Sequence, residues 1–133
     1  MIVVDTNVLA YLLIAGDRTR DVQALFARDP EWKSESFILV EFSNILVTYQ
    51  RTGALTQRRA HGLLAEAEKR VRDLVTVPHR RALDIADACR VSAYDARFLA
   101  AAEAFGTRLV TEDARLRAAA PDRTTSVAES LTS

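Results

Sequence analysis

The sequence predicts an α/β protein, a three-layer α/β/α sandwich with a mostly parallel sheet of four to five strands between two layers of helices. Two observations support this fold class. Short apolar runs alternate along the chain with longer segments of helical periodicity, and this alternation is typical of parallel sheets covered on both faces. In addition, the 133 residues contain no repeat, linker or low-complexity stretch. We therefore expect a single domain over residues 1–133.

The first half of the chain is expected to contain two strands and four helices. Ile2–Val4 is a β-branched run typical of a buried strand. Apolar residues then recur at helical spacing, for example Ile38, Phe42 and Ile45, and Gly53 ends that helix because glycine readily adopts a left-handed conformation. The expected elements are a strand at 2–4, helices at about 6–15 and 19–28, a strand at about 32–36, and helices at about 37–51 and 56–71.

The second half of the chain continues the alternation. Leu74–Val77 and Arg108–Thr111 are short apolar runs that we interpret as strands. Two helical segments lie between them, and Gly106 ends the second. The expected elements are a strand at 74–77, helices at about 80–90 and 94–105, a strand at 108–111, a helix at about 114–119 and a strand at about 124–128.

Composition restricts the classes of function. The 18 basic residues equal the 18 acidic residues, so the overall charge does not indicate nucleic acid. The single cysteine, Cys89, builds neither a disulfide framework nor a cysteine-based zinc site. The apolar segment Met1–Ala15 lacks a basic leader and contains Asp5 and Asn7, so we expect neither a signal peptide nor a membrane span. We therefore expect a cytoplasmic protein with no membrane partner.

Two acidic residues follow predicted strands directly. Asp5 comes after Ile2–Val4, and Asp113 lies just beyond Leu109–Thr111. Binding sites in open parallel sheets form beyond the carboxyl ends of the strands. The two carboxylates will therefore converge if their strands are close neighbours. Each acid alone can instead be a helix N-cap, and that alternative stays open for both.

Two further acidic residues lie on predicted helices. Glu41 stands beside an apolar stripe, where an ionised glutamate is seldom buried without a partner. Asp95 stands in a first helical turn, on the same face as Phe98, where a carboxylate gains from the helix dipole. The alternatives are a salt bridge with an arginine for Glu41 and cap or dipole chemistry for Asp95.

A divalent cation would resolve the repulsion among four converging carboxylates. Mg²⁺ and Mn²⁺ take oxygen ligands and suit sparse carboxylate sites. Such a cation can activate water for attack on phosphorus and stabilise the leaving oxygen. We interpret His61 and His79 as structural or solvated and Cys89 as a small core residue, so none of the three belongs to the expected site.

Four short motifs occur in the order seen in PIN-domain nucleases. They are Val4–Asn7, Val40–Phe42, Tyr94–Ala96 and Val110–Asp113. The chain resembles this family over nearly its whole length, and its size resembles that of the VapC toxins of bacterial toxin–antitoxin pairs. The resemblance implies a PIN-like three-layer fold, Mg²⁺ or Mn²⁺ as cofactor, cleavage of RNA, a homodimer, and a cognate antitoxin that holds the enzyme inactive.

The resemblance also implies roles for individual residues. The acidic quartet that binds the cation and carries catalysis would be Asp5, Glu41, Asp95 and Asp113. Thr6, Asn7 and Thr111 match the polar residues beside this quartet, and we expect them to orient the acids. The alternative is a PIN-type scaffold that binds protein or RNA without catalysis, which the loss of an acid would favour; none is lost.

Arginines near the quartet are candidates for contact with phosphate. An acidic pocket repels RNA unless basic residues offset its charge. Arg97 and Arg115 lie two residues beyond Asp95 and Asp113, so either can lie at the rim of the pocket. The alternative for both arginines is a surface ion pair.

A phosphotransfer fold is the competing class. Receiver domains and dehalogenase-type phosphatases also place an aspartate after the first strand. Both need a lysine late in the chain, whereas the last lysine here is Lys69. The dehalogenase pattern also needs a second aspartate two residues after the first, where this chain has Asn7. The sequence therefore favours the nuclease.

Overall fold

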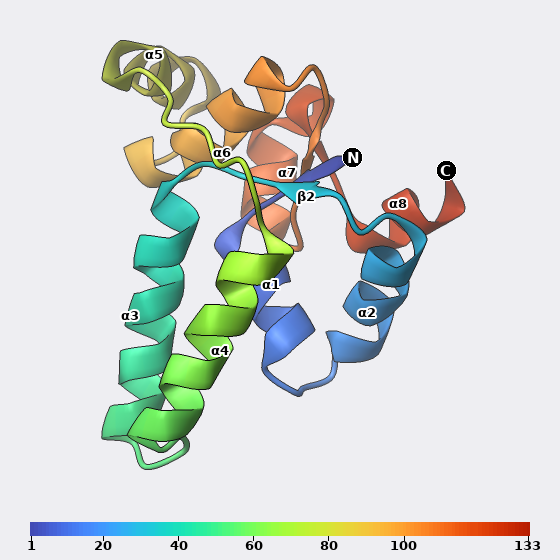
Figure 1. Cartoon of the computed structure of the whole chain (residues 1–133). Helices are drawn as coiled ribbons and strands as arrows, with labels where there is room; N and C mark the ends of the chain where they lie inside the picture. Colours follow the sequence, from blue (N-terminus) through green and yellow to red (C-terminus); the bar gives the residue numbers. More distant parts are fainter.

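Three layers form the architecture, as predicted (Figure 1). The computed structural model describes all residues, 1–133. Its elements are β1 (Ile2–Val4), α1 (Thr6–Leu13), α2 (Thr19–Arg28), β2 (Trp32–Lys33), α3 (Phe37–Arg51), α4 (Gln57–Arg70), α5 (His79–Cys89), α6 (Ala93–Ala104), β3 (Leu109–Val110), α7 (Ala114–Ala119), the 3₁₀ turn η1 (Pro121–Arg123), β4 (Thr124–Thr125) and α8 (Val127–Thr132).

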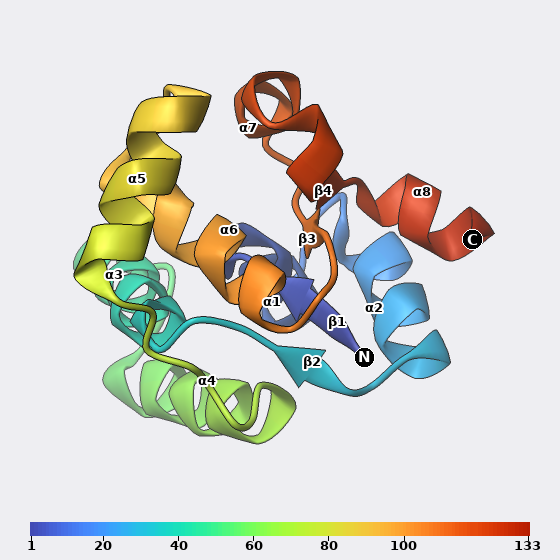
Figure 2. The same ribbon diagram turned by 90° about the horizontal axis from the view of Figure 1, so that it is seen from above.

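The sheet has four strands, all parallel, in the order β2-β1-β3-β4 (Figure 2). In the register of the central pair, Val3 lies beside Leu109 and Val4 beside Val110. Parallel neighbours end at the same edge of a sheet. The residues that follow β1 and β3 therefore come together, as the positions of Asp5 and Asp113 in the sequence predict.

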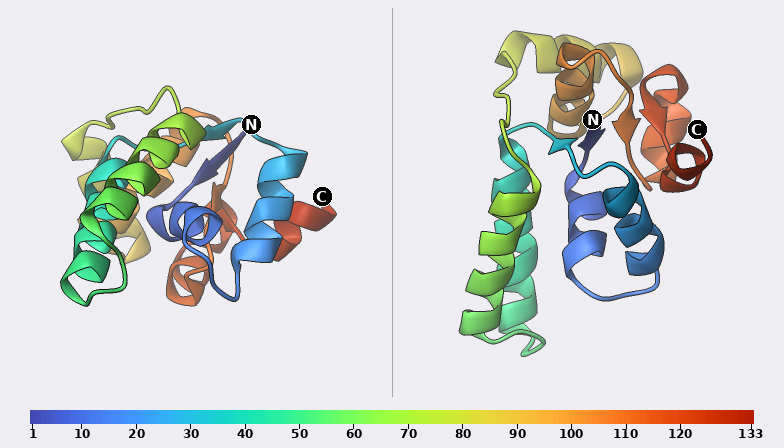
Figure 3. Two further views of the ribbon diagram at one scale, coloured as in Figure 1. Left: turned by 60° about the horizontal axis from the view of Figure 1, so that its bottom comes forward. Right: turned by 45° about the vertical axis from the view of Figure 1, so that its right-hand side comes forward.

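Helices cover both faces of this sheet. On one face α6 packs against β1 and β3, and α5 packs on α6; Figure 1 places both helices above the sheet. On the other face α1 leaves the end of β1 and packs against α2, α3 and α4. The two views in Figure 3 show α3 and α4 side by side, as a pair that extends away from the sheet. The carboxyl ends of the central strands thus open between α3 and α6.

One continuous core fills the space between the layers. Its largest fully buried side chains include Trp32, Phe42 and Phe98. Trp32 anchors the short strand β2, because its ring packs edge-on against Phe26 with the ring centroids 5.1 Å apart. The predicted C-terminal stops of α3 and α6 are confirmed by positive φ angles in the glycines that follow them, 84° at residue 53 and 71° at residue 106.

The prediction was wrong in two segments. Residues 74–77 contain one isolated bridge, between Val75 and Glu35, rather than a strand. A second bridge pairs Val71 with Trp32, and Asp73, whose φ is 53°, turns the chain between the two. The expected strand at 124–128 ends at residue 125, and helix α8 follows. A capping box starts this helix: the Ser126 hydroxyl accepts from the Glu129 backbone N–H, and the Glu129 carboxylate accepts from the Ser126 backbone N–H.

Helices in this structure do not reach the combination of length and hydropathy that a membrane-crossing helix requires.

Candidate active site

All four predicted acids line one cavity of about 540 Å³. They arrive from four separate segments: Asp5 from the end of β1, Glu41 from α3, Asp95 from α6 and Asp113 from the residue before α7. Thr6 and Asn7 line the same cavity. The structure therefore brings together residues that lie up to about one hundred positions apart in the sequence.

Asp5 occupies the floor of the cavity. Its side chain caps α1, because Oδ1 accepts a hydrogen bond from the Val8 backbone N–H at 3.1 Å. Oδ2 accepts a short hydrogen bond from the Thr111 hydroxyl. The pKa of Asp5 is raised to about 6. Burial is the main cause, the charges of Asp95 and Asp113 add to it, and the two hydrogen bonds act in the opposite direction. With 8% of its surface exposed, Asp5 is both a helix cap and a candidate ligand.

Glu41 projects from α3 toward the first turn of α1. Its Oε1 accepts a hydrogen bond from the Thr6 hydroxyl at 2.6 Å. This glutamate forms no ion pair with an arginine, so the salt-bridge alternative does not hold. The hydroxyl of Thr6 fixes one oxygen of Glu41 and leaves the second without a hydrogen-bond partner in the protein.

Asp95 stands in the first turn of α6, where its backbone N–H donates to the Ser92 hydroxyl at 3.0 Å. Ser92 is therefore the N-cap of this helix, and the Asp95 carboxylate is not needed as its cap. Partial burial raises the pKa of Asp95, and the nearby charge of Asp113 raises it further. The charges of Asp95 and Asp113 thus oppose the ionisation of Asp5, and the charge of Asp113 opposes the ionisation of Asp95.

Asp113 is exposed and caps α7. Its Oδ1 accepts from the backbone N–H groups of Arg115 and Leu116 at 2.9 and 3.1 Å. Thr111 joins this acid to the first one, because its hydroxyl donates to Asp5 and accepts from the Asp113 backbone N–H at 3.1 Å. The predicted position of Thr111 beside the acids is therefore what the structure shows.

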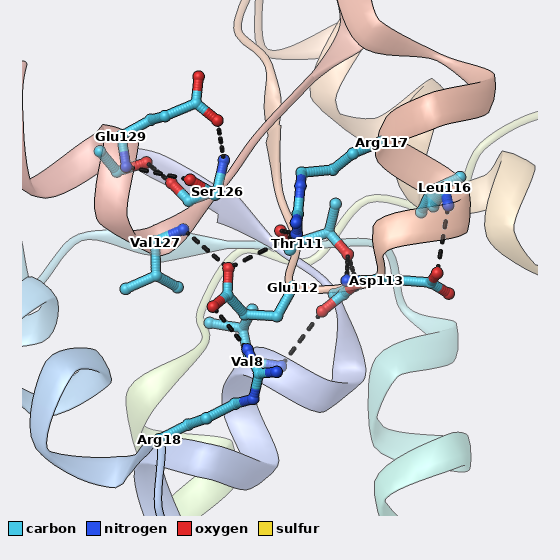
Figure 4. A network of polar contacts seen from close by, with 12 residues as sticks. Val8, Arg18, Thr111, Glu112, Asp113, Leu116, Arg117, Ser126, Val127 and Glu129 are labelled. Carbon is cyan, nitrogen blue, oxygen red and sulfur yellow. Dashed lines mark hydrogen bonds and ion pairs between the residues drawn. The ribbon is translucent and has the colours of Figure 1, made fainter.

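Glu112 anchors the loop that carries Thr111 and Asp113 (Figure 4). Its carboxylate points away from the cavity: it binds Arg18 Nη1 at 2.8 Å and accepts from the Val127 backbone N–H at 3.0 Å. These contacts tie the loop to the segment before α2 and to the start of α8. Glu112 was not among the residues singled out from the sequence. It stands between two predicted site residues, and the sequence does not indicate in which direction its side chain points.

The structure places the two predicted phosphate contacts, Arg97 and Arg115, in different surroundings. The rim position predicted for Arg97 was wrong, because its side chain forms an ion pair with Glu35 and does not line the cavity. Its side chain is only 16% exposed, and its guanidinium lies 3.3 Å from the carboxylate of Glu35, on the other side of α6. Arg115 does not line the cavity either, but it is exposed and its backbone N–H donates to the Asp113 carboxylate at the edge of the site, so its contact with phosphate stays a prediction.

Sequence reasoning missed three residues near the cavity. Glu35 is completely buried, although nothing in its local sequence marks it. Phe37 and Tyr94 line the cavity, and their rings stack with centroids 5.6 Å apart. Tyr94 remains 62% exposed, which places an aromatic face at the rim. Three other residues lie outside the cavity, in agreement with the prediction: the exposed His61 and His79 and the partly buried Cys89.

Divalent cations fit the donor chemistry of this cavity. The acids offer hard oxygen ligands, and a cation would offset the burial and repulsion that raise the pKa of Asp5 and Asp95. As arranged, no three of them are close enough to bind one ion directly. This spacing suits Mg²⁺, which keeps several waters and is commonly held by one or two carboxylates. Asp5 and Asp95, which both line the cavity, would hold it.

The sequence model of the PIN domain family matches residues 2–121. The chain belongs to the PIN domain family. PIN domains are generally nucleases and commonly use divalent metal ions, so this PIN domain is placed in a nuclease family. The phosphotransfer alternative is thereby rejected. A comparison with curated proteins found no match.

Solved structures share the PIN fold. The crystal structure of PAE2754 from Pyrobaculum aerophilum superposes with a TM-score of 0.80 at 21% identity, over 98% of this chain and 92% of the other. A toxin–antitoxin complex from Klebsiella pneumoniae gives a TM-score of 0.62 at 20% identity, over 96% of this chain and 98% of the other. At these identities the likeness shows the fold alone.

Proposed function

We propose that this PIN domain is a Mg²⁺- or Mn²⁺-dependent endoribonuclease that hydrolyses phosphodiester bonds of RNA. One observation carries the proposal: four acids from separate segments line one cavity, where burial and the charge of neighbouring acids raise the pKa of Asp5 and of Asp95. Asp5 and Asp113 also cap helices, but capping does not account for Glu41 and Asp95 in the same cavity. Perturbed carboxylates in a cleft are typical of functional sites.

The acids would hold the cation, and the neighbouring hydroxyls would orient the acids. When bound, a divalent cation supplies an activated water and stabilises the leaving oxygen of the phosphodiester. Thr111 holds Asp5 and the Asp113 backbone in one arrangement, and Thr6 holds Glu41. Such hydrogen bonds determine where each carboxylate points, and metal sites depend on them.

RNA reaches the acids only if its phosphates meet compensating charge. Arg115, at the edge of the site, is the basic residue that we assign to this contact. Asn7 is exposed and lines both the acidic cavity and an adjoining hollow of about 420 Å³, so RNA that extends from one hollow into the other would pass this residue.

We also propose that the protein is the toxin of a cytoplasmic toxin–antitoxin pair. The similarity to a solved toxin–antitoxin complex supports a cognate antitoxin as partner. A homodimer is part of this proposal. Its support is the exposed apolar surface of α3: Val40, which also lines the cavity, is 59% exposed, and Leu39 and Val47 are partly exposed.

The test is cleavage of mixed cellular RNA by the purified protein with Mg²⁺, with Mn²⁺ and with chelator. Asp5→Asn and Asp95→Asn are compared with Asp87→Asn, which replaces an exposed aspartate on α5 outside the cavity. We expect metal-dependent cleavage that both cavity variants abolish and the α5 variant retains. If the folded protein cleaves nothing and calorimetry detects no Mn²⁺ binding, the proposal is rejected in favour of a non-catalytic scaffold.

A further inference from the structure

Glu35 is a buried carboxylate that the proposed reaction does not use. It follows β2, has no exposed surface, and does not line the acidic cavity. A buried carboxylate is costly unless hydrogen bonds and an opposite charge compensate it. Its contacts therefore show which parts of the fold it holds together.

Both carboxylate oxygens of Glu35 are occupied. Oε1 accepts from the Phe37 backbone N–H at 2.7 Å and from the Ser36 hydroxyl at 3.3 Å. Oε2 accepts from the Val77 backbone N–H at 2.8 Å and from Arg97 Nη2 at 3.3 Å. One side chain thus binds the start of α3, the segment before α5, and α6.

Arg97 connects this carboxylate to the helix that carries Asp95. Residues two apart on a helix point about 200° apart, since successive residues turn by about 100°. Asp95 therefore faces the cavity while Arg97 faces Glu35. The second guanidinium nitrogen of Arg97 lies 3.2 Å from Nδ1 of His79. The ion pair consequently restrains the rotation of α6 about its own axis.

A second contact joins the same two helix starts on the other side. The ring of Phe37, whose backbone N–H binds Glu35, stacks on the ring of Tyr94, which directly precedes Asp95. The first turns of α3 and α6 are therefore held together beneath the cavity by an ion pair and at its rim by stacked rings. Glu41 lies one turn further along α3.

We propose that Glu35 and Arg97 form a positioning pair that sets the placement of Asp95 relative to Glu41 and thereby determines divalent-cation affinity in the cavity. This inference rests on the proposed function, since it assumes that the cavity binds a cation. Neither residue contacts the cation or the substrate. The pair acts through the two helices whose first turns it joins.

The far end of α6 provides a matched control. Glu103 pairs there with Arg81 of α5 and with Arg123 of η1. Glu103→Gln therefore removes a charged contact of the same helix without touching the turn that carries Asp95. A purely structural role for Glu35 predicts that both substitutions lower stability and that neither changes cation affinity.

The experiment measures Mn²⁺ affinity by calorimetry and urea unfolding for Glu35→Gln, Arg97→Gln, Arg97→Lys and Glu103→Gln. Loss of a residue that orients metal ligands typically weakens affinity by about 10–100-fold. We expect a loss in that range for Glu35→Gln and Arg97→Gln. Arg97→Lys keeps the positive charge opposite Glu35 and should recover most of the affinity, whereas Glu103→Gln should bind Mn²⁺ within about twofold of the unmodified protein.

A double variant covers the case in which a single substitution prevents folding. Glu35→Gln with Arg97→Met removes both charges, which buried pairs tolerate better than the loss of one partner. We expect this variant to fold and to bind Mn²⁺ weakly. Unchanged Mn²⁺ affinity in folded variants that lack the pair overturns the inference alone. Absence of Mn²⁺ binding in the unmodified protein overturns the proposed metal site together with the inference.

Discussion

Replacing Asp5 by asparagine should stabilise the metal-free protein at neutral pH. Burial raises the pKa of Asp5 from 3.8 to about 6, so the folded state binds its proton more tightly than the unfolded state does. Stability from this group is therefore complete below about pH 4 and is lost as the pH rises through about 6. Asparagine keeps a side-chain oxygen for the cap of α1 and has no charge to lose.

The size of the effect follows from the two pKa values. A tenfold change in an acid dissociation constant corresponds to about 1.4 kcal/mol, so a pKa that rises from 3.8 to about 6 makes ionised Asp5 cost about 3 kcal/mol of folding free energy. This is a large part of the stability of a typical domain, which is about 5–15 kcal/mol. The same cost is what a bound cation would offset.

Urea unfolding between pH 4 and pH 8 in chelator measures this difference. We expect the free energy of unfolding of Asp5→Asn, relative to the unmodified protein, to increase by about 2–3 kcal/mol across this range. Asp87→Asn, on the exposed side of α5, should show no such change. Added Mn²⁺ should reverse the order at pH 7.5, because it stabilises the folded form that binds it.

A difference between Asp5→Asn and the unmodified protein that stays constant with pH would refute this reasoning. It would mean that Asp5 ionises as easily in the folded as in the unfolded chain. A second outcome is that Asp5→Asn is more stable than the unmodified protein and that Mn²⁺ does not reverse this order. That result would support the burial of Asp5 and contradict its proposed role in binding a cation.

Three further predictions test the surroundings of the site. Thr111→Val removes the hydroxyl that lowers the pKa of Asp5. NMR titration should therefore find the pKa of Asp5 above about 6, and calorimetry should find Mn²⁺ affinity reduced about tenfold. An unchanged titration of Asp5 contradicts this prediction. Arg115→Ala should raise the KM for RNA and leave Mn²⁺ affinity unchanged, and an unaltered KM would remove this residue from the substrate path. Glu112→Gln should lower the free energy of unfolding by about 1–2 kcal/mol in urea, since it weakens the contact with Arg18; equal stability would show that the loop is held by other contacts.

Local patterns were enough to predict most of the elements. Some patterns depend only on residues a few positions apart: the β-branched run of β1, the apolar stripe of α3 and the glycines after α3 and α6. The strand, the helix and the helix ends that they predict are all confirmed. The strand expected at 74–77 and the continued strand at 124–128 failed for local reasons as well. The positive φ of Asp73 and the capping box at Ser126 outweigh apolar runs that are each only a few residues long.

The candidate site could be predicted only in part, because the sequence gives the positions of residues along the chain but not the directions of their side chains. The positions of Asp5 and Asp113 after strands imply convergence once the sheet is parallel, and the structure places both strands side by side. The direction of each side chain is not contained in such a pattern. Arg97 stands two residues from Asp95 in the sequence but points to the other side of α6, because a helix turns by about 100° per residue and a buried carboxylate lies there to receive it.

The sequence by itself determined the layered α/β class, the four acids and the helix starts and stops, because these depend on periodicity, residue type and chain order. Only the tertiary structure decided which acids are buried, which hydroxyl each one meets, and that Glu35 joins the starts of α3 and α6. These features arise from packing between segments far apart in the chain. Their energies depend on burial and on distances of a few ångströms, and both exist only after the layers have come together.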